Sequence, residues 1–271
     1  MTYEFQIAPA GDYKLRYLDV GQGPAVLLIH GLAGDCAGWF PLIEALRDRH
    51  RVIAFDNRGA GQSTQIDEPI TTADLAGDTF ALLDHLNLES VQVVGRSMGG
   101  AVAQIMALQA PERIRSMVLC ASFAKLDPLG VRVLTIMREV LEWRGSWQDH
   151  ARHSVHYFLS PDSFNCRPEM VTRIESLIGG ESRLQEAYSH QNRACVAHDT
   201  VARLPQIRQP VLVLAGAQDP IASAVATGQL STGLPNSETV LFENASHFFL
   251  LEQQARFHGL VAQWLQRHSP A

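Results

Sequence analysis

A predicted strand passes directly into a predicted helix near residue 97, and this junction constrains the fold more than any other part of the sequence. Val91 to Val94 predicts a strand and Met98 to Gln109 predicts a helix, with only the motif Gly95-Arg96-Ser97-Met98-Gly99 at the join. A serine in so sharp a turn has strained backbone, and side chains at the two glycines would collide with neighbouring backbone. The junction therefore predicts a serine hydroxyl held above the carboxyl edge of a sheet.

Other short apolar runs alternate with helical patterns, which is typical of a parallel sheet built from βαβ units. We expect further strands at Tyr13 to Leu18, Ala25 to His30, Arg51 to Phe55, Met117 to Ala121, Val211 to Ala215 and Glu238 to Phe242. We expect further helices at Gly38 to Arg49, Thr72 to Leu86 and about Gln253 to Arg267. Continuous apolar runs of this kind fit strands that are covered on both faces.

Strand signals stop between residues 125 and 203, where the chain becomes helical and rich in aromatic side chains. Similar strands stand on either side of this segment, so we interpret it as an insertion and not as an independent domain. The sequence therefore predicts an α/β fold with a mostly parallel central sheet flanked by helices. Residues 1–124 and 204–271 are expected to form its core domain, and residues 125–203 a helical cap between the sixth and seventh strands.

The composition limits which kinds of partner the protein is expected to bind and in which cellular compartment it is expected. The 271 residues are 46% hydrophobic, enough for a large core, and 22 Lys and Arg stand against 28 Asp and Glu for a formal net charge of −6. No basic run offsets the negative charge, so we expect no nucleic-acid partner. The N-terminal segment carries charges throughout, and apolar runs are about five residues long against the ~18 needed to cross a bilayer. We therefore expect a cytoplasmic protein with no membrane segment.

Neither the cysteines nor the histidines form a metal-binding pattern. The four cysteines are widely spaced and form no C-x-x-C motif, so we interpret them as buried reduced thiols, with disulfides or metal ligands as the alternative. In the expected cap, His150, His153 and His156 are spaced i, i+3 and i+6. On a helix this spacing turns His156 well away from His150, so we expect no metal site.

A second glycine-rich loop, His30-Gly31-Leu32-Ala33-Gly34, follows a predicted strand and is expected to overhang the same sheet edge as Ser97. The backbone N–H groups of Leu32 and Met98 then point at the oxygen that becomes negative when Ser97 attacks a carbonyl. We expect these two amides to form an oxyanion hole. We interpret His30 as structural, because it precedes the loop and has a glycine behind it.

Serine is a poor nucleophile at neutral pH, so a base and an orienting acid are needed downstream. Asp219 and His247 each follow a predicted strand, at the same kind of position one strand apart. The chain between them suffices for one helix and one strand, so both side chains are expected to reach Ser97 from adjacent loops. Asp127 is the alternative acid, because it trails the last strand before the cap.

Together these residues resemble the α/β-hydrolase superfamily over nearly the whole chain. The loop Phe55 to Ser63 resembles the D-x-R-G-x-G-x-S loop of its small lid-bearing members, which is structural there and gives Arg58 no catalytic role. The chain is most similar to 3-oxoadipate enol-lactonase-like and aminoacrylate-hydrolase-like proteins and related carboxylesterases. The resemblance implies these roles: Ser97 as nucleophile, His247 as base, Asp219 as acid, and the amides of Leu32 and Met98 as oxyanion hole.

Two residues depart from the usual pattern of these relatives, and both are expected to bind substrate. Arg96 stands where relatives usually carry Leu, Asn, His or Tyr; its guanidinium either holds a substrate carboxylate or pairs with a neighbouring acid under the cap. Phe248 stands where carbon-carbon bond hydrolases commonly carry Trp, which disfavours a meta-cleavage-product hydrolase. Aromatic residues of the cap are expected to wall an apolar acyl pocket, and Trp143 is our candidate there.

The sequence thus predicts cofactor-independent hydrolysis of a small carboxylic ester, lactone or related acyl compound through an acyl-enzyme. Serine at position 97 excludes haloalkane dehalogenase and epoxide hydrolase chemistry, which need an aspartate nucleophile. Two alternatives stay open: the same triad used for carbon-carbon bond hydrolysis or lyase chemistry, and a non-catalytic ligand receptor on the same fold. The expected partner is a small-molecule acyl substrate. A homodimer is allowed, although no feature of the sequence argues for one.

Overall fold

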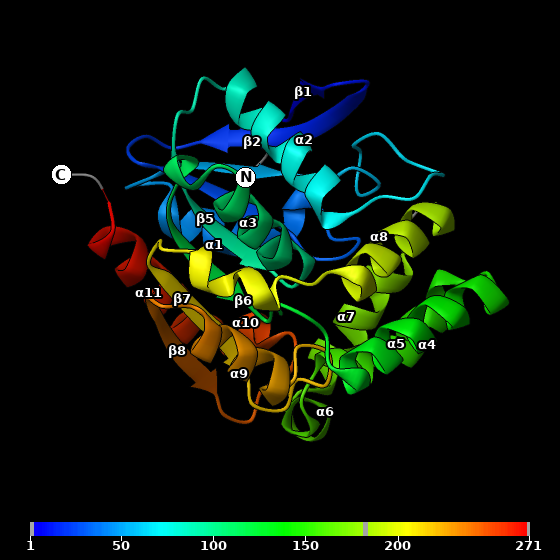
Figure 1. Cartoon of the computed structure of the whole chain (residues 1–271). Helices are drawn as coiled ribbons and strands as arrows, with labels where there is room; N and C mark the ends of the chain where they lie inside the picture. Colours follow the sequence, from blue (N-terminus) through cyan, green and yellow to red (C-terminus); the bar gives the residue numbers. More distant parts are fainter. Residues whose placement is uncertain (1–2, 181–183, 270–271) are drawn as a thin grey trace.

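An eight-stranded sheet forms the centre of the computed structural model, which describes residues 3–180 and 184–269 (Figure 1). Its strands lie in the order β1-β2-β4-β3-β5-β6-β7-β8. Strand β2 is antiparallel to both of its neighbours, and the other neighbouring pairs are parallel. The strands are β1 (Gln6–Ala10), β2 (Tyr13–Val20), β3 (Ala25–Ile29), β4 (Arg51–Phe55), β5 (Val91–Arg96), β6 (Ile114–Cys120), β7 (Val211–Gly216) and β8 (Ser237–Phe242). The predicted mostly parallel α/β sheet is confirmed.

The hydrophobic pattern does not predict β1, which the structure places at the edge of the sheet. Only Ala8 and Ala10 of this strand are buried, so no apolar run marks it. A turn at Gly11, whose φ is +59°, folds β1 back onto β2. Pro9 lies within β1, a position that an edge strand tolerates because the proline nitrogen need not donate to a further strand.

Helices cover both faces of the sheet because successive residues of a strand face opposite ways. In β3, Leu27 and Ile29 join the core on one face, and Val26 and Leu28 join the core on the other. The first face is covered by α2 (Thr72–His85), α3 (Met98–Gln109) and α9 (Ala224–Gly233). The second is covered by α1 (Phe40–Leu46) and α11 (Gln254–Arg267).

Within the described residues, five α-helices lie between β6 and β7 and gather on one side of the sheet, to the right and below in Figure 1. They are α4 (Pro128–Arg144), α5 (Trp147–Phe158), α6 (Pro161–Cys166), α7 (Pro168–Gly179) and α8 (Gln185–Ala197). Oxygens of Asp127, Ser146 and Ser160 accept backbone N–H groups in the first turns of α4, α5 and α6, which explains where these helices begin. The helical insertion lies between the sixth and seventh strands, as predicted, although the predicted strands supply only five of the six that precede it, because β1 is not among them.

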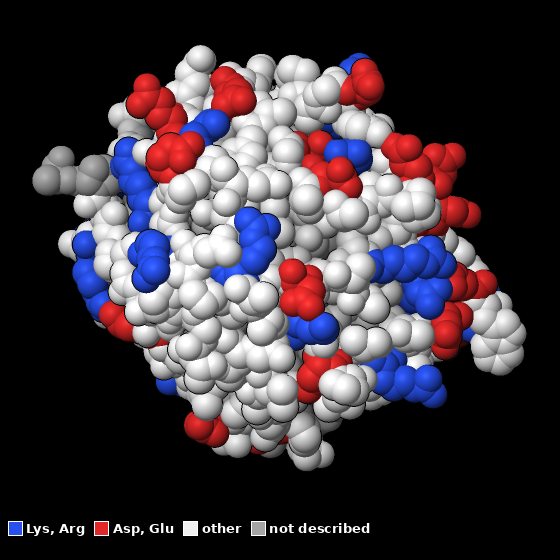
Figure 2. Space-filling model, in the orientation of Figure 1, with Lys and Arg blue, Asp and Glu red and all other residues white. Residues whose placement is uncertain are grey.

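Four short helical segments complete the chain: η1 (Cys36–Trp39), η2 (Pro111–Arg113), η3 (Val201–Gln206) and α10 (Phe249–Glu252). The cysteines Cys36, Cys120 and Cys195 are buried free thiols, as expected, whereas Cys166 is exposed because it lies at the outer end of α6. Across residues 3–180 and 184–269, no helix has the length and apolar character needed to cross a membrane. On the face drawn in Figure 2, acidic and basic side chains are interspersed.

Candidate active site

Ser97 occupies the sharp turn between β5 and α3 that the sequence predicts. Its φ of 50° and ψ of −117° lie in a region that non-glycine residues rarely adopt. A Cβ at Gly95 would lie 2.5 Å from the Gly99 carbonyl oxygen, and a Cβ at Gly99 would lie 2.1 Å from that of Ile29. The glycines therefore permit the close packing that holds the turn. The strained backbone is also fixed by the Ser122 hydroxyl, which donates to the Ser97 carbonyl at 2.9 Å.

The loop after β3 packs directly against this turn. A Cβ at Gly31 would lie 3.1 Å from the Ser97 Cβ and 3.8 Å from the Ser97 Oγ. The predicted oxyanion donor Leu32 is the next residue along the loop, and Met98 is the first residue of α3, whose N–H has no partner within its own helix. The structure thus brings the two predicted oxyanion amides to the neighbourhood of the serine hydroxyl.

Asp219 and His247 form a buried pair in the loops after β7 and β8. His247 Nδ1 lies 2.8 Å from Asp219 Oδ2. The second carboxylate oxygen accepts the N–H groups of Ile221 at 2.7 Å and Ala222 at 3.0 Å. Because this carboxylate only accepts when ionised, the geometry assigns the proton of the neutral ring to Nδ1 and leaves Nε2 free to accept one.

The two loops are also joined to each other. The Gln218 N–H donates to the Ala245 carbonyl at 2.9 Å, and the Ser246 hydroxyl donates to the Gln218 carbonyl at 3.2 Å. A Cβ at Gly216 would lie 2.3 Å from the Ser246 carbonyl oxygen, so a glycine is needed where the loops meet. The acid and the histidine are therefore held as one rigid unit.

A contact between flanking residues brings this unit to the serine. The Arg96 guanidinium lies over the Phe248 ring, 3.9 Å from its centroid, so the residue before Ser97 touches the residue after His247. Among the described residues, the Ser97 hydroxyl is not hydrogen-bonded to His247. Ser97 is 8% exposed.

Arg96 is a buried cation, and the described part of the chain gives it no ion pair. No carboxylate among the described residues pairs with its guanidinium, whose Nη1 lies 3.5 Å from His30 Nε2. Burial lowers the pKa of Arg96 to about 10, an effect that the nearby Asp219 charge partly offsets. The side chain therefore keeps its charge at neutral pH. Of the two interpretations of Arg96, pairing with a neighbouring acid finds no partner among residues 3–180 and 184–269.

The structure separates the remaining predicted residues from the triad or gives them other contacts. Asp127, the alternative acid, caps α4 with one oxygen and accepts from the Ser223 hydroxyl at 2.6 Å with the other. Trp143 is 82% exposed near the end of α4, so the structure does not bring it into the site. His150 is buried, with Nδ1 3.0 Å from the Met137 carbonyl oxygen.

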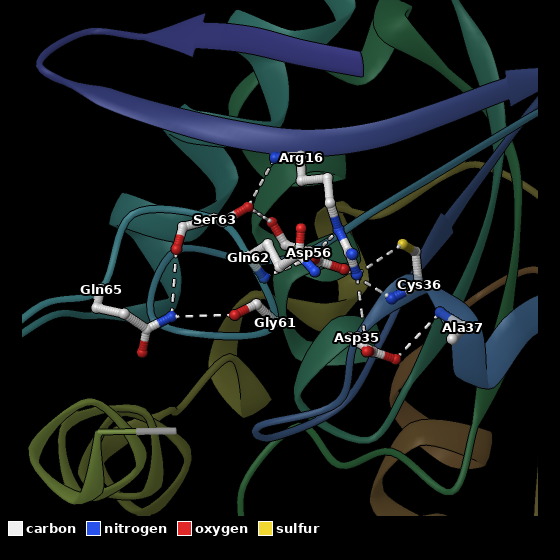
Figure 3. A network of polar contacts seen from close by, with 9 residues as sticks. All are labelled: Arg16, Asp35, Cys36, Ala37, Asp56, Gly61, Gln62, Ser63 and Gln65. Carbon is white, nitrogen blue, oxygen red and sulfur yellow. Dashed lines mark hydrogen bonds and ion pairs between the residues drawn. The ribbon is translucent and has the colours of Figure 1, made fainter. Parts of the chain in front are cut away.

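The Asp56 to Ser63 loop is a scaffold, as the family resemblance implies (Figure 3). Asp56 accepts from Arg16 Nε at 2.7 Å and from the N–H groups of Cys36 at 2.8 Å and Gln62 at 2.9 Å. These charge-assisted bonds tie β2 and η1 to the loop after β4. Arg58 is used in a buried bidentate pair with Asp78 on α2, at 2.7 and 2.6 Å.

Sequence reasoning missed two buried polar side chains that join the cap to the site loops. Glu252 accepts from the Ser246 N–H at 2.7 Å and from the Ser160 N–H at 2.8 Å. Gln191 on α8 reaches the loop after β3. Both lie on helices, where a polar residue predicts a solvated face. No local signal marks them, because their partners are distant in the sequence.

Comparisons with known proteins agree with this fold and arrangement. Residues 24–254 match the family described as alpha/beta hydrolase fold. That match spans most of the chain, which therefore belongs to the α/β hydrolase family.

Relatives within the family include several kinds of hydrolase. The chain is 30% identical to a putative carbamate hydrolase RutD of Agrobacterium fabrum, over 90% of this chain and 94% of the relative. It is 30% identical to 3-oxoadipate enol-lactonase 2 of Acinetobacter baylyi, over 95% of each chain. Among solved structures, a thermophilic esterase of Thermogutta terrifontis with malate bound superposes with a TM-score of 0.86 at 27% identity, covering 100% of each chain. The enol-lactonase of Burkholderia xenovorans LB400 gives 0.88 at 25% identity, covering 96% of this chain and 100% of that one.

Proposed function

We propose that this protein is a serine hydrolase that cleaves a small carboxylic ester, lactone or related acyl compound through an acyl-enzyme. The observation that carries the proposal is the buried His247–Asp219 pair, at 2.8 Å, which the contact of Arg96 with Phe248 links to a serine in a strained strand-to-helix turn. Relatives named enol-lactonase and carbamate hydrolase, and a solved esterase, support acyl transfer as the reaction class. The residues 125–203 are proposed to cap the site.

In this mechanism, Ser97 Oγ attacks the carbonyl carbon of the substrate while His247 Nε2 takes the hydroxyl proton. Asp219 keeps the ring oriented and stabilises the imidazolium that forms. The N–H groups of Leu32 and Met98 bind the oxygen that becomes negative. The imidazolium then gives its proton to the leaving group, and a water molecule, activated by the same histidine, releases the acyl group from Ser97.

The hydrogen bond between Ser97 and His247 that this mechanism needs is expected to form when substrate enters. Catalytic hydrogen bonds are often long in unliganded enzymes and shorten in the complex. The stacked rings of Phe158 and Phe248, with centroids 4.5 Å apart, contact the His247 loop and keep that side of the site apolar. We propose Phe248 as a wall of the substrate pocket on this basis.

We further propose that Arg96 favours substrates that carry a second, negatively charged group. No carboxylate among the described residues neutralises the buried Arg96 guanidinium, so its charge acts over several ångströms in a low-dielectric site, even though the Phe248 ring lies against it. Its position directly before Ser97 supports this role, because an anionic acyl substrate bound to Ser97 would lie within range. The malate in the related Thermogutta esterase is itself a dicarboxylate.

The experiment is active-site labelling with a fluorophosphonate together with a p-nitrophenyl acetate burst. Wild-type protein should be labelled once per chain and release one equivalent of p-nitrophenol in the burst. Ser97→Ala should lose the label, keep its fold and lower turnover by several orders of magnitude, up to about 10⁶. Ser176→Ala, an exposed serine on α7, is the matched control and should behave as wild type.

Retention of a tenth of wild-type turnover in Ser97→Ala would contradict the assignment. A protein that is neither labelled nor gives a burst, but binds acyl compounds, would instead be a ligand receptor. A panel of p-nitrophenyl esters of increasing chain length, run beside lactones and a carbamate, then defines the acyl preference.

A further inference from the structure

One side chain of the cap reaches into the core and contacts the loop that carries the proposed oxyanion donor. Gln191 on α8 is fully buried. Its Oε1 accepts from the Ala33 N–H at 2.8 Å, and its Nε2 donates to the Arg58 carbonyl at 2.7 Å. Because a backbone N–H only donates and a carbonyl only accepts, the two partners determine how the amide is oriented.

The Ala33 N–H belongs to a strained turn. The Gly34 N–H donates to the Gly31 carbonyl at 3.0 Å, which closes a four-residue turn with Leu32 and Ala33 at its centre. Ala33 has a φ of +57°, a left-handed conformation that glycine, or less often asparagine, adopts readily at the third residue of such a turn and alanine does not. An alanine here relaxes to negative φ unless contacts hold it.

The Gln191 amide is the contact that opposes this relaxation. Rotation of the Leu32–Ala33 peptide would carry the Ala33 N–H away from Oε1 and leave that oxygen buried without a donor, which is costly. Tyr188, one turn earlier on α8, packs in the same apolar cluster as Ala33 and seats the helix there. At its other amide atom, Gln191 packs against Gly59: a Cβ at Gly59 would lie 3.4 Å from Gln191 Nε2.

We propose that Gln191 is a positioning residue: it holds the oxyanion turn in its working conformation, so that the cap completes the site as well as covering it. The inference rests on the proposed serine hydrolase function. In this proposal, the position of the Leu32 N–H, one residue before Ala33, depends on Gln191. Gln191 lies on α8 and is 158 residues from Ala33 in the sequence. Gln191 itself touches no reacting atom.

The test compares Gln191→Met with Asn192→Leu. Met keeps the length of the side chain and loses both hydrogen bonds. Asn192 is the matched control, because it is also fully buried on α8 but donates within the cap, to the Leu134 carbonyl at 3.0 Å. With p-nitrophenyl acetate, Gln191→Met should lower kcat by about 10- to 100-fold, below the 10²- to 10³-fold that loss of an oxyanion donor costs, with KM within about threefold of wild type.

A second substitution separates positioning from general stability. Glycine adopts positive φ without strain, so Ala33→Gly added to Gln191→Met should restore at least part of the lost kcat. The rate of fluorophosphonate labelling should fall in Gln191→Met and recover when Ala33→Gly is added. That reaction also develops negative charge on an oxygen, so it needs the same oxyanion turn. Asn192→Leu should keep kcat within about twofold of the wild-type value, even if its melting temperature falls as much as that of Gln191→Met.

The proposal is overturned if Gln191→Met loses no more kcat than Asn192→Leu, if it changes KM alone, or if Ala33→Gly restores nothing. Should Gln191→Met not fold, Gln191→Glu takes its place. As a neutral acid in this buried site, its side chain still accepts from the Ala33 N–H with one oxygen and donates from the other to the Arg58 carbonyl. A kcat within about threefold of wild type is therefore expected, and a 100-fold loss in the folded protein overturns the proposal. A wild-type protein that shows no Ser97-dependent turnover would instead refute the proposed function.

Discussion

The guanidinium of Arg96 lies over the ring of Phe248, with its central carbon 3.9 Å from the ring centroid. One residue directly precedes Ser97 and the other directly follows His247, so this contact links the serine turn to the histidine loop. A desolvated cation on an aromatic face contributes about 2 kcal/mol. The two elements of the proposed triad are thus held together by their neighbours in the sequence.

Replacing Arg96 by Leu tests what its charge does. If the charge favours anionic substrates, Arg96→Leu should lower kcat/KM for the monoethyl ester of succinate by about 1.5–3 kcal/mol, roughly 10- to 150-fold. Ethyl butyrate, a neutral ester of matched length, should be turned over almost as before. Because no acid in the described part of the chain is paired with Arg96, thermal melts should show no penalty from an acid left unpaired. Equal losses on both esters would limit Arg96 to packing against Phe248.

Replacing Asp219 by Asn should preserve the shape of the site but favour the wrong tautomer of His247, at a cost of about 10⁴ in kcat. Asp127→Asn is the control, since Asp127 caps α4 and bonds Ser223 without touching His247. Because asparagine caps a helix about as well as aspartate, Asp127→Asn should change the free energy of unfolding by less than about 0.5 kcal/mol and leave kcat nearly unchanged. The opposite pattern would make Asp127 the catalytic acid.

Much of the site could be predicted because its residues stand at the ends of strands. Ser97, Asp219 and His247 each follow a strand that an apolar run marks, and parallel strands bring their carboxyl ends to one edge. Glycines at positions 95 and 99 are local signals of the turn between strand and helix. These inferences need only periodicity and short-range sterics.

The contacts of the cap could not be predicted, because they depend on how α4 to α8 lie over the sheet. Gln191 and Asn192 are adjacent and polar, yet one bonds the core and the other bonds α4. Trp143 and Trp147 are both aromatic residues of the cap, but a turn at Gly145, with φ of +65°, separates their helices. In each of these two pairs, packing between segments that are distant in the sequence decides which residue contacts the core.

The two tryptophans provide a further prediction. Trp147 is buried and packs edge-on against Tyr188, 5.5 Å between ring centroids, in the cluster that includes Ala33. Trp147→Ala should therefore cost about 3–5 kcal/mol in the free energy of unfolding. Trp143→Ala should change that quantity by less than about 0.5 kcal/mol and leave kcat/KM unaltered, because the side chain is 82% exposed. Urea titrations and ester kinetics on Trp147→Ala and Trp143→Ala check both statements. A raised KM in Trp143→Ala would show that Trp143 contacts the substrate after all.

His198 makes the stability of the fold depend on pH. It lies where the chain leaves α8 for the core, buried, with Nδ1 2.9 Å from the Thr72 hydroxyl and Nε2 3.4 Å from the Thr200 hydroxyl. Burial lowers the pKa of His198 to about 4, with the Asp199 charge offsetting part of the effect. The folded protein therefore keeps this ring neutral under conditions in which the unfolded chain, with a pKa near ~6.5, binds a proton.

A lowered pKa on a histidine means that its contribution to stability is complete above about pH 6.5 and is lost as the pH falls toward 4. Between pH 7 and pH 5 the free energy of unfolding should fall by about 2 kcal/mol through this group. His198→Gln, which stays neutral and still bonds both threonines, should remove that part of the decline. Other histidines with lowered pKa, such as His50 and His258, titrate in both proteins and cancel in the comparison. Urea unfolding at the two pH values gives the difference directly, and parallel declines in wild type and His198→Gln would show that His198 is not its source.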